Sequence, residues 1–542
     1  QLAGFGDDDQ LLPFFRRKAI PVFVAEARKL IPYLADAVPG WFQAVLTLYD
    51  AEGNKLEFDD DFRFHPDPVL FFEVPEDGEY ELEIRDSIFR GREDFVYRVS
   101  VGELPFVTNI FPLGAPKGRK LNVHLTGWNL PVDTLTVDTT DMEPGIHYLE
   151  VKAGKVPSNR VPFMVSDLPE QFEQENNNTN SKAQAVPLGQ IVNGRIDVPG
   201  DWDVFAFDGK KGEKVVVEVT ARRLESPVDS IVRIADAKGN LIAANDDYKD
   251  PAFGLITHHA DSYVMCELPE NGRYYVQLGD TQQHGGPEYV YRLRISKPRP
   301  DFELRLSPAS MTVRSGVPAP VMVYAVRRDG FDGPIDLRLR HRGEGFVLAG
   351  GRIPPGADNV PVTLMVPTPR PRPYLPQIEG TAVIGGKEVS RIAVPAEDMM
   401  QAFIYQHLVP AESWMVYATG RLVKGPVPNL LVTRSIEIPR GGSAEVVVRL
   451  PRYIPQGGEL KFELKNPPEG IAVENVRVTD ANAVLTLYAD EEKVAQGQAG
   501  NLIVAISLSR KRDPGNGAPV RVTVTPIGVL PAIPYRIGPG DG

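Results

Sequence analysis

The sequence predicts an all-β protein built as a linear array of about five β-sandwich domains. Glycine and proline are abundant (49 and 50 of 542 residues), yet 42% of the chain is hydrophobic. That combination suits many short strands joined by tight turns. Short runs of alternating apolar and polar residues recur along the chain, and one β-rich unit occurs twice. A chain of this length holds several domains, each with a core of its own.

The repeat shows in matching segments at a constant offset. Ala27-Arg28-Lys29-Leu30 recurs as Ala221-Arg222-Arg223-Leu224, 194 positions later, and Tyr97-Arg98 recurs as Tyr291-Arg292 at the same offset. The first unit carries extra residues at 31–38, for which we expect one short helix. A repeat on this scale predicts a string of domains.

The first domain, residues 1–104, is termed copy one. Strands are expected where apolar residues alternate with polar ones, and Asp-Ala-Glu-Gly-Asn at 50–54 and Glu-Asp-Gly at 76–78 supply turns. These strands are 22–27, 44–49, 70–74, 80–84 and 95–99. From the register of the repeat we expect copy one to be N-terminally incomplete.

Residues 105–168 form the second predicted domain. Asn109-Ile110-Phe111-Pro112-Leu113-Gly114 is followed by an alternating strand and the corner Gly127-Trp128-Asn129-Leu130. This pattern resembles the start of an immunoglobulin-like domain of the IPT/TIG type. The resemblance implies a fold and no activity.

The third domain, residues 169–298, is termed copy two. It resembles the bacterial pre-peptidase C-terminal domain, a jelly-roll-like β-sandwich that accompanies secreted peptidases and occurs in long surface proteins. The matching runs are Glu173-Gln174-Glu175-Asn176-Asn177-Asn178, Gly194-Arg195-Ile196, Gly200-Asp201-Trp202-Asp203, Asn271-Gly272-Arg273-Tyr274 and Tyr289-Val290-Tyr291-Arg292-Leu293. The domain order also resembles multidomain envelope proteins of planctomycete-type bacteria.

The resemblance implies a calcium site in copy two. In calcium-binding members an acidic Glu-x-Glu segment joins acidic residues of the next strand around the ion. Calcium takes six to eight hard oxygen ligands, which carboxylates and amides supply. The residues at the matching positions are Glu173, Glu175, Asn177, Asn178, Asp201 and Asp203. The alternative is a polar linker followed by a turn aspartate.

Residues 299–396 and 397–542 complete the array. Both stretches alternate strand-like runs with turns, and a Pro-rich joint at 367–373 interrupts the first. Two further immunoglobulin-like sandwiches are the simplest interpretation.

Composition and motifs exclude several functions. A net charge of −13 disfavours nucleic acid as a partner. The single cysteine, Cys266, excludes an intrachain disulfide and a cysteine-based zinc site. No apolar run approaches the roughly 18 residues of a membrane span. No catalytic motif is present, and we expect His258-His259 to lie in a solvated loop.

We therefore predict a non-enzymatic exported protein, located outside the cell or in its envelope. It would act as a structural, adhesive or binding scaffold of the cell surface, with calcium as a stabilising ion. Its partners would be other surface proteins, further copies of itself or an extracellular polymer. The alternative is an accessory binding region of a secreted peptidase or other hydrolase whose catalytic domain lies outside this chain.

Copy one raises one further question. In copy two a strand-like run at 190–196 precedes Gly200-Asp201, whereas only five residues precede the matching Gly6-Asp7 in copy one. A sandwich without that strand exposes unpaired backbone groups. Three explanations are open: a rebuilt domain, a longer parent chain, or a strand donated by another polypeptide near residues 11–15.

Overall fold

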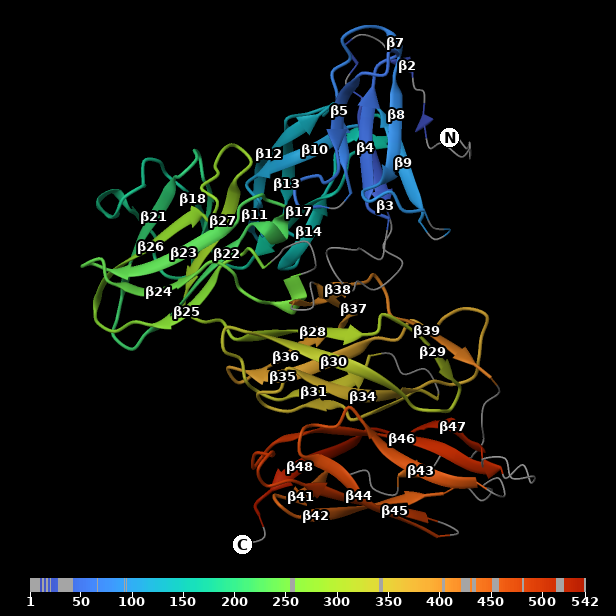
Figure 1. Cartoon of the computed structure of the whole chain (residues 1–542). Helices are drawn as coiled ribbons and strands as arrows, with labels where there is room; N and C mark the ends of the chain where they lie inside the picture. The colour runs from blue at the N-terminus through green and yellow to red at the C-terminus, as the bar shows by residue number, and fades with distance from the viewer. Residues whose placement is uncertain are drawn as a thin grey trace. The chain divides into compact units, whose positions relative to one another are not determined.

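The computed structural model describes residues 10–11, 14–15, 18–19, 21–27, 42–65, 67–91, 93, 95–253, 259–340, 345–401, 405–420, 429–430, 435–450, 458–479, 482–512 and 521–540. The helix expected at 31–38 lies outside them. The chain divides into two compact units, residues 1–299 with 399–407 and residues 300–398 with 408–542. The described elements are strands and short 3-10 turns, which confirms the all-β fold class (Figure 1). None of the described helices is long and apolar enough to cross a membrane.

Copy one is a sandwich of a four-stranded sheet, β1-β8-β4-β5, and a three-stranded sheet, β6-β3-β9, with the short pair β2-β7. Phe23 on β3 and Leu46 on β4 are fully buried in the core between the sheets. The strands are β1 (Gln10–Leu11), β2 (Phe14–Phe15), β3 (Val22–Ala27), β4 (Ala44–Tyr49), β5 (Lys55–Asp59), β6 (Val69–Phe71), β7 (Gly78–Glu79), β8 (Glu81–Asp86) and β9 (Tyr97–Gly102).

The next segment forms two small sheets, β10-β12-β13 and β11-β17-β14, and the pair β15-β16. Phe163 and Val123 lie in the core between these sheets. The strands are β10 (Phe106–Phe111), β11 (Gly114–Pro116), β12 (Lys120–Trp128), β13 (Thr134–Asp138), β14 (Gly145–Leu149), β15 (Lys152–Ala153), β16 (Val156–Pro157) and β17 (Val161–Ser166).

Copy two packs two five-stranded sheets, β18-β20-β27-β22-β25 and β19-β21-β26-β23-β24, face to face. Phe205 and Val217 come from opposite sheets and meet in the core, against which the half-buried Cys266 packs. Its elements are β18 (Glu170–Phe172), η1 (Asn180–Lys182), β19 (Gln184–Ala185), β20 (Gln190–Arg195), β21 (Trp202–Gly209), β22 (Lys214–Thr220), η2 (Arg222–Leu224), β23 (Ser230–Asp236), β24 (Leu241–Asn245), η3 (Pro251–Phe253), β25 (Tyr263–Glu267), β26 (Gly272–Asp280) and β27 (Val290–Ser296).

The internal repeat extends to the strand register. In copy one, β3 pairs with β9 so that Val22 lies opposite Gly102. In copy two, β22 pairs with β27 so that Val216 lies opposite Ser296, each residue 194 positions later. A one-residue slip would turn every side chain to the other face of the sheet. The two copies therefore share one pairing scheme as well as short sequence motifs.

The edge of copy one differs from that of copy two. Among the described residues, β9 borders only β3, whereas its counterpart β27 also pairs with β20. Near the start of the chain, Gln10 lies opposite Glu83 and Phe14 opposite Glu79. The chain's own residues 10–11 and 14–15 thus pair at this edge. Donation of a strand to copy one by another polypeptide remains a prediction.

The second unit contains two further sandwiches. The first joins β32-β34-β30-β28-β37-β38 to β33-β31-β35-β36, with β29-β39 beside them. Strand β37 crosses residues 396 and 397, so the boundary predicted there falls inside a strand. The strands are β28 (Asp301–Ser307), β29 (Ser310–Arg314), β30 (Ala319–Arg328), β31 (Ile335–Leu339), β32 (Val347–Ala349), β33 (Arg352–Ile353), β34 (Asn359–Met365), β35 (Ile378–Ile384), β36 (Lys387–Ile392), β37 (Val394–Gln401), β38 (Tyr405–Pro410) and β39 (Met415–Thr419).

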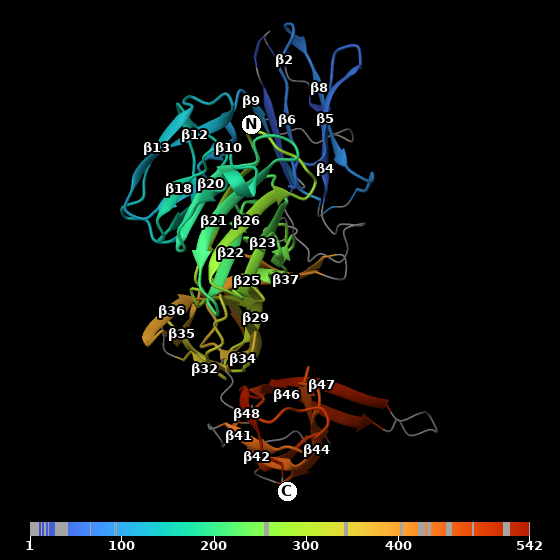
Figure 2. The same ribbon diagram turned by 90° about the vertical axis from the view of Figure 1, so that its left-hand side faces the viewer.

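The last sandwich packs β40-β42-β45-β44 against β41-β48-β46-β43, and β47 pairs with β46. Strands β46 and β47 form a long hairpin (Figure 2), and β43 pairs with β46 from Ile503 to Arg510. The strands are β40 (Asn429–Leu430), β41 (Ile436–Pro439), β42 (Ser443–Arg449), β43 (Gly458–Lys465), β44 (Ile471–Val478), β45 (Asn482–Ala489), β46 (Ala499–Arg512), β47 (Arg521–Val529) and β48 (Ile533–Gly538).

The core of copy two yields a stability prediction. Replacing the fully buried Phe205 by alanine should lower the free energy of unfolding of this domain by about 3–5 kcal/mol, because transfer free energy is lost and a cavity remains. The matched control is Leu241→Ala on exposed β24, for which we expect a change within about 0.5 kcal/mol. Urea unfolding followed by circular dichroism measures both, and equal effects would contradict the assigned core.

Candidate metal centre

The acidic segment of copy two is held against two strands by backbone hydrogen bonds. The Glu173 N–H donates to the Asn193 carbonyl on β20 at 3.0 Å. The Val204 N–H on β21 donates to the Asn177 carbonyl at 3.1 Å. Residues 173–178 therefore lie beside the start of β21, where Asp203 stands. The sequence order alone, a polar stretch and then a strand, did not specify this placement.

Three carboxylates meet at this crossing. Glu173, Glu175 and Asp203 each place one oxygen so that the three atoms lie within 4.8 Å of one another. Asp203 is fully buried, Glu173 is half-buried and Glu175 is exposed. The group therefore has an inner wall of protein and an outer side open to solvent, so an ion could reach it.

Tyr291 on β27 links two of the three carboxylates. Its hydroxyl lies 2.8 Å from Asp203 Oδ2 and 3.1 Å from Glu173 Oε1, and it donates its single proton to one of them at a time. Gly194 on β20 makes room for this contact, because a Cβ there would lie 2.4 Å from the Tyr291 ring and 2.7 Å from Glu173 Oε2. This explains the glycine of the Gly-Arg-Ile run.

The electrostatics of the cluster favour either protons or a cation. Burial, followed by the charge of Glu173, raises the pKa of Asp203 to about 11. Burial and the charge of Glu173 also raise the pKa of Glu175. Carboxylates this close cannot all ionise without a compensating positive charge.

Two buried oxygen atoms near the cluster show whether its residues are suited to hold a metal ion. Among the described residues, Asn177 Oδ1 and Asp203 Oδ1 have no hydrogen-bond partner, although both side chains are fully buried. A buried acceptor without a partner costs about 1–3 kcal/mol, so such atoms are rare in folded proteins. Carboxylate and amide oxygens are the ligands that calcium prefers. The residues present fit a calcium ion.

The structure unites part of the predicted site. Glu173, Glu175 and Asp203 form the cluster, and Asn177 Nδ2 donates to Glu173 Oε1 at 3.0 Å. Asn178 and Asp201 instead hydrogen-bond to each other, and Asp201 Oδ1 also accepts the Trp202 N–H. Binding of the metal itself remains a prediction.

Sequence reasoning missed a second buried polar group beside this cluster. Arg292, 2% exposed, donates to Glu170 Oε1 at 2.5 Å, and Asn193 Nδ2 donates to Glu170 Oε2 at 2.7 Å. Gly114 of β11 lies against the guanidinium, since a Cβ there would meet Arg292 Nη1 at 1.8 Å. An arginine inside the apolar run Tyr291-Arg292-Leu293 was the available signal, but its partner lies 122 residues away.

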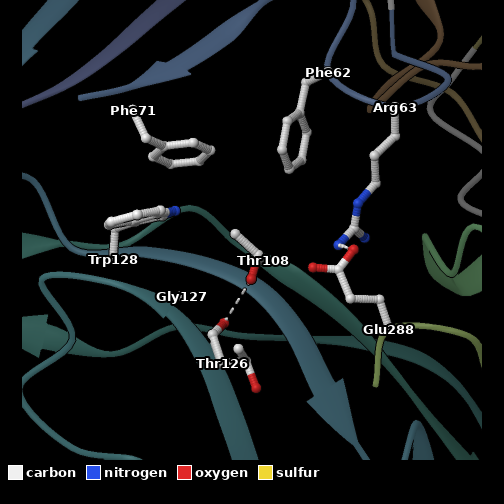
Figure 3. A pocket seen from close by; sticks show the side chains of 8 residues that line it. All are labelled: Phe62, Arg63, Phe71, Thr108, Thr126, Gly127, Trp128 and Glu288. Atoms are coloured by element: carbon white, nitrogen blue, oxygen red, sulfur yellow. Dashed lines mark hydrogen bonds and ion pairs between the residues drawn. The ribbon is translucent and has the colours of Figure 1, made fainter. Parts of the chain in front are cut away.

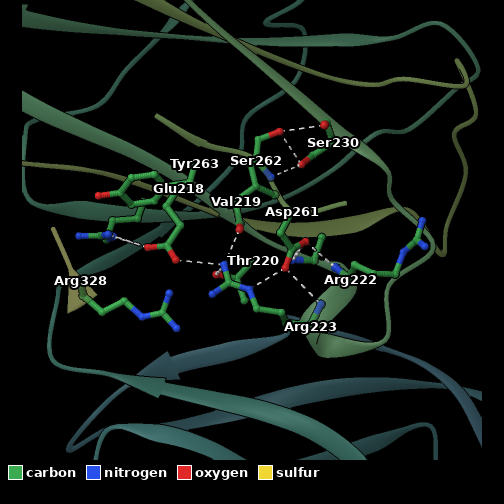
Figure 4. Close-up of polar contacts among 12 residues, drawn as sticks. Glu218, Val219, Thr220, Arg222, Arg223, Ser230, Asp261, Ser262, Tyr263 and Arg328 are labelled. Atoms are coloured by element: carbon green, nitrogen blue, oxygen red, sulfur yellow. Dashed lines mark hydrogen bonds and ion pairs between the residues drawn. The ribbon is translucent and has the colours of Figure 1, made fainter. Parts of the chain in front are cut away.

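Asp261 explains the Ala221-Arg222-Arg223-Leu224 segment of copy two (Figure 4). Its Oδ1 accepts the N–H groups of Ala221 and Arg222, at 3.0 and 2.7 Å. Its Oδ2 accepts the Arg223 Nε–H at 2.7 Å, and Arg223 also pairs with Glu218. The buried carboxylate thus fixes the turn that follows β22. The equivalent Arg28 of copy one lies outside the described residues.

The histidine prediction needs correction. His259 is only 4% exposed, and its ring stacks on His407 with centroids 5.0 Å apart. It is therefore packed and not part of a solvated loop; His258 lies outside the described residues.

Comparisons with known proteins add the following. No family model matches the chain. A probable subtilase-type serine protease of Deinococcus radiodurans is 29% identical over 139 residues, which cover 24% of this chain and 18% of the protease. The match thus spans less than a fifth of that relative.

Two solved structures are also similar. One is the pre-peptidase C-terminal domain of a collagenase from Bacillus anthracis, with 15% identity and a TM-score of 0.17, covering 22% of this chain and all of that domain. The other is Titin-A168169, with 12% identity and a TM-score of 0.12, covering 44% of this chain and 98% of that structure. The fold assignment rests on the sheets of this chain itself.

Glu225, which follows η2, gives a pH prediction. Burial raises its pKa to about 7, although the charge of Arg63 opposes the rise. The folded protein therefore binds this proton more tightly than the unfolded chain. The resulting stability is fully present below pH 4.5 and is lost as the pH rises to about 7. In Glu225→Gln the free energy of unfolding should fall by on the order of 2 kcal/mol less than in wild type over this pH range, because the variant has no carboxyl group to titrate at this position.

Urea unfolding of both proteins between pH 4.5 and 7.5 measures the effect. Glu52→Gln, at an exposed turn of copy one, is the control and should follow the wild-type profile. Parallel profiles for wild type and Glu225→Gln would show that the carboxyl is not perturbed.

Proposed function

We propose that the chain is a non-enzymatic, exported binding scaffold of the cell surface, with copy two stabilised by calcium. The observation that carries this proposal is the Glu173–Glu175–Asp203 cluster with its two partnerless buried oxygens. Without a cation, the close carboxylates and the unpaired oxygens lower the free energy of unfolding of copy two. A bound cation would raise it. A site that holds calcium by oxygen ligands alone suits a structural role outside the cell, where calcium is abundant.

The family assignment belongs to this proposal. We assign copy two, and copy one by its shared strand register, to the pre-peptidase C-terminal domains, and residues 105–168 to the IPT/TIG type. Gly194 and Tyr291 support this, because both stand in the matching runs and both build the cluster. The two sandwiches of the second unit would act as immunoglobulin-like spacers. Suitable partners are other surface proteins, further copies of the chain or an extracellular polymer.

The second candidate function is an accessory binding region of a secreted protease. The similarity to the Deinococcus protease over 139 residues favours it. Both candidates assign binding and no catalysis to this chain. Negative-stain images with calcium separate them: fibres or sheets are expected of a structural component, and single particles of an accessory region.

Calcium addition is the direct test. Relative to a chelator, calcium at a hundredfold excess over its Kd should stabilise copy two by about 2.7 kcal/mol, because only the folded state offers the site. Asp203→Asn should abolish this gain. In chelator the same variant should melt no lower than wild type, because asparagine has the shape of the neutral, protonated Asp203 that its raised pKa implies. Differential scanning calorimetry with calcium and with EDTA measures both quantities.

The matched control is Asp208→Asn, an exposed position on the same strand β21. It removes an equal charge away from the cluster and should leave the calcium shift unchanged. Superimposable wild-type melts with calcium and with EDTA would refute the metal proposal. An equal shift in Asp203→Asn would place the ion elsewhere.

A further inference from the structure

A cavity of about 450 Å³ lies in the first unit, where copy one, the segment 106–166 and copy two meet (Figure 3). This volume is within the range of sites for small molecules. One side of the cavity is aromatic and the other polar. The principal lining residues are Phe62, Phe71, Trp128, Arg63, Thr108 and Glu288.

The aromatic side is fixed by ring packing. Phe71 stacks on Trp128 with centroids 5.1 Å apart and planes 20° from parallel. Phe62 meets Phe71 edge to face at 6.2 Å. Gly127 allows β12 to approach β10, because a Cβ there would lie 2.0 Å from the Phe106 carbonyl. The rings therefore form a preformed apolar wall, and Trp128 remains 36% exposed to solvent.

The polar side carries donors and acceptors but no net charge. Arg63 Nη2 lies 2.7 Å from Glu288 Oε2, and Arg63 Nη1 donates to the Glu225 carbonyl. The Thr108 hydroxyl donates to the Thr126 carbonyl and keeps its own lone pairs available. The indole nitrogen of Trp128 is turned toward Thr108 (Figure 3), and no described residue accepts its N–H.

The chemical groups on the aromatic and polar sides of the cavity indicate which class of ligand it can bind. An anion or a cation gains little, because Arg63 and Glu288 neutralise each other. A purely apolar ligand would cover the Arg63–Glu288 pair and the indole N–H, and it would offer the indole N–H no hydrogen-bond partner. A sugar ring offers an apolar C–H face for the aromatic wall and hydroxyls for the polar one. We infer that this cavity binds a sugar unit of a neutral polysaccharide.

The proposed function includes an extracellular polymer as a partner, and this inference specifies that polymer as a neutral polysaccharide. The inference therefore rests on the proposed function. It does not depend on calcium, because neither the cluster residues nor their contacts line the cavity. Measuring sugar binding with calcium and with EDTA, on samples whose calcium melts are known, separates the failure of one proposal from that of the other.

The experiment uses the full chain and a panel of cellotetraose, chitotetraose, maltotetraose and mannotetraose. Saturation-transfer NMR finds binders, and isothermal titration calorimetry measures their Kd. We expect at least one to bind, and Trp128→Ala to weaken it at least tenfold. Trp128→Phe keeps a ring but removes the N–H, and should weaken binding severalfold while preserving the fold.

Tyr148→Ala is the control, because Tyr148 is an exposed aromatic of the same segment outside the cavity. Its Kd should equal that of wild type. The inference is overturned if no tetrasaccharide binds, or if both Trp128 variants bind as wild type does. Binding of a proline decapeptide that requires Trp128, without sugar binding, would assign the cavity to a peptide instead.

Discussion

Tyr291, a member of the apolar core of copy two, places one hydroxyl between two carboxylates, and the neighbouring segments are arranged around that contact. Burying charge in a protein interior is costly unless hydrogen bonds or a counter-charge compensate. Gly194 has no side chain that would collide with the Tyr291 ring. Backbone hydrogen bonds hold the segment 173–178 against β20 and β21 beside it. The tyrosine supplies one proton to two carboxylates, so further protons or a cation must compensate the remaining charge of the cluster; the partnerless oxygens of Asn177 and Asp203 are the argument for a cation.

The duplication shows how the same two residues take different roles. Tyr97 and Arg98 of copy one stand where Tyr291 and Arg292 stand in copy two, on strands with the same register. Yet Tyr97 is 36% exposed and stacks on Phe42, and Arg98 is exposed. In copy two, β20 and the segment leading to it cover these positions. Burial, and not the residue type, thus makes the pair part of a polar centre.

The sequence predicted the features that depend on local pattern. Alternation and turn residues predicted the all-β class, and the Glu-x-Glu run with Asp203 predicted three residues that the fold unites. It did not predict the role of Tyr291, the Glu170–Arg292 pair or the burial of His259, because their partners lie far away in the chain. The boundary predicted at residue 396 falls inside β37 for a related reason: alternating apolar and polar residues indicate a strand but do not indicate which sheet the strand joins.

The cavity depends on three segments at once, and the contacts that join them are specific. Leu224 and Val290 of copy two are buried in the core cluster of residues 106–166, so these two domains share apolar packing. The Asn109 side chain donates to the Pro287 carbonyl, directly beside Glu288. The Arg222 guanidinium lies over the Phe64 ring, one residue from Arg63. The Asn109 and Arg222 contacts each hold a neighbour of a lining residue, so the cavity is a property of the assembled unit and not of any one sandwich.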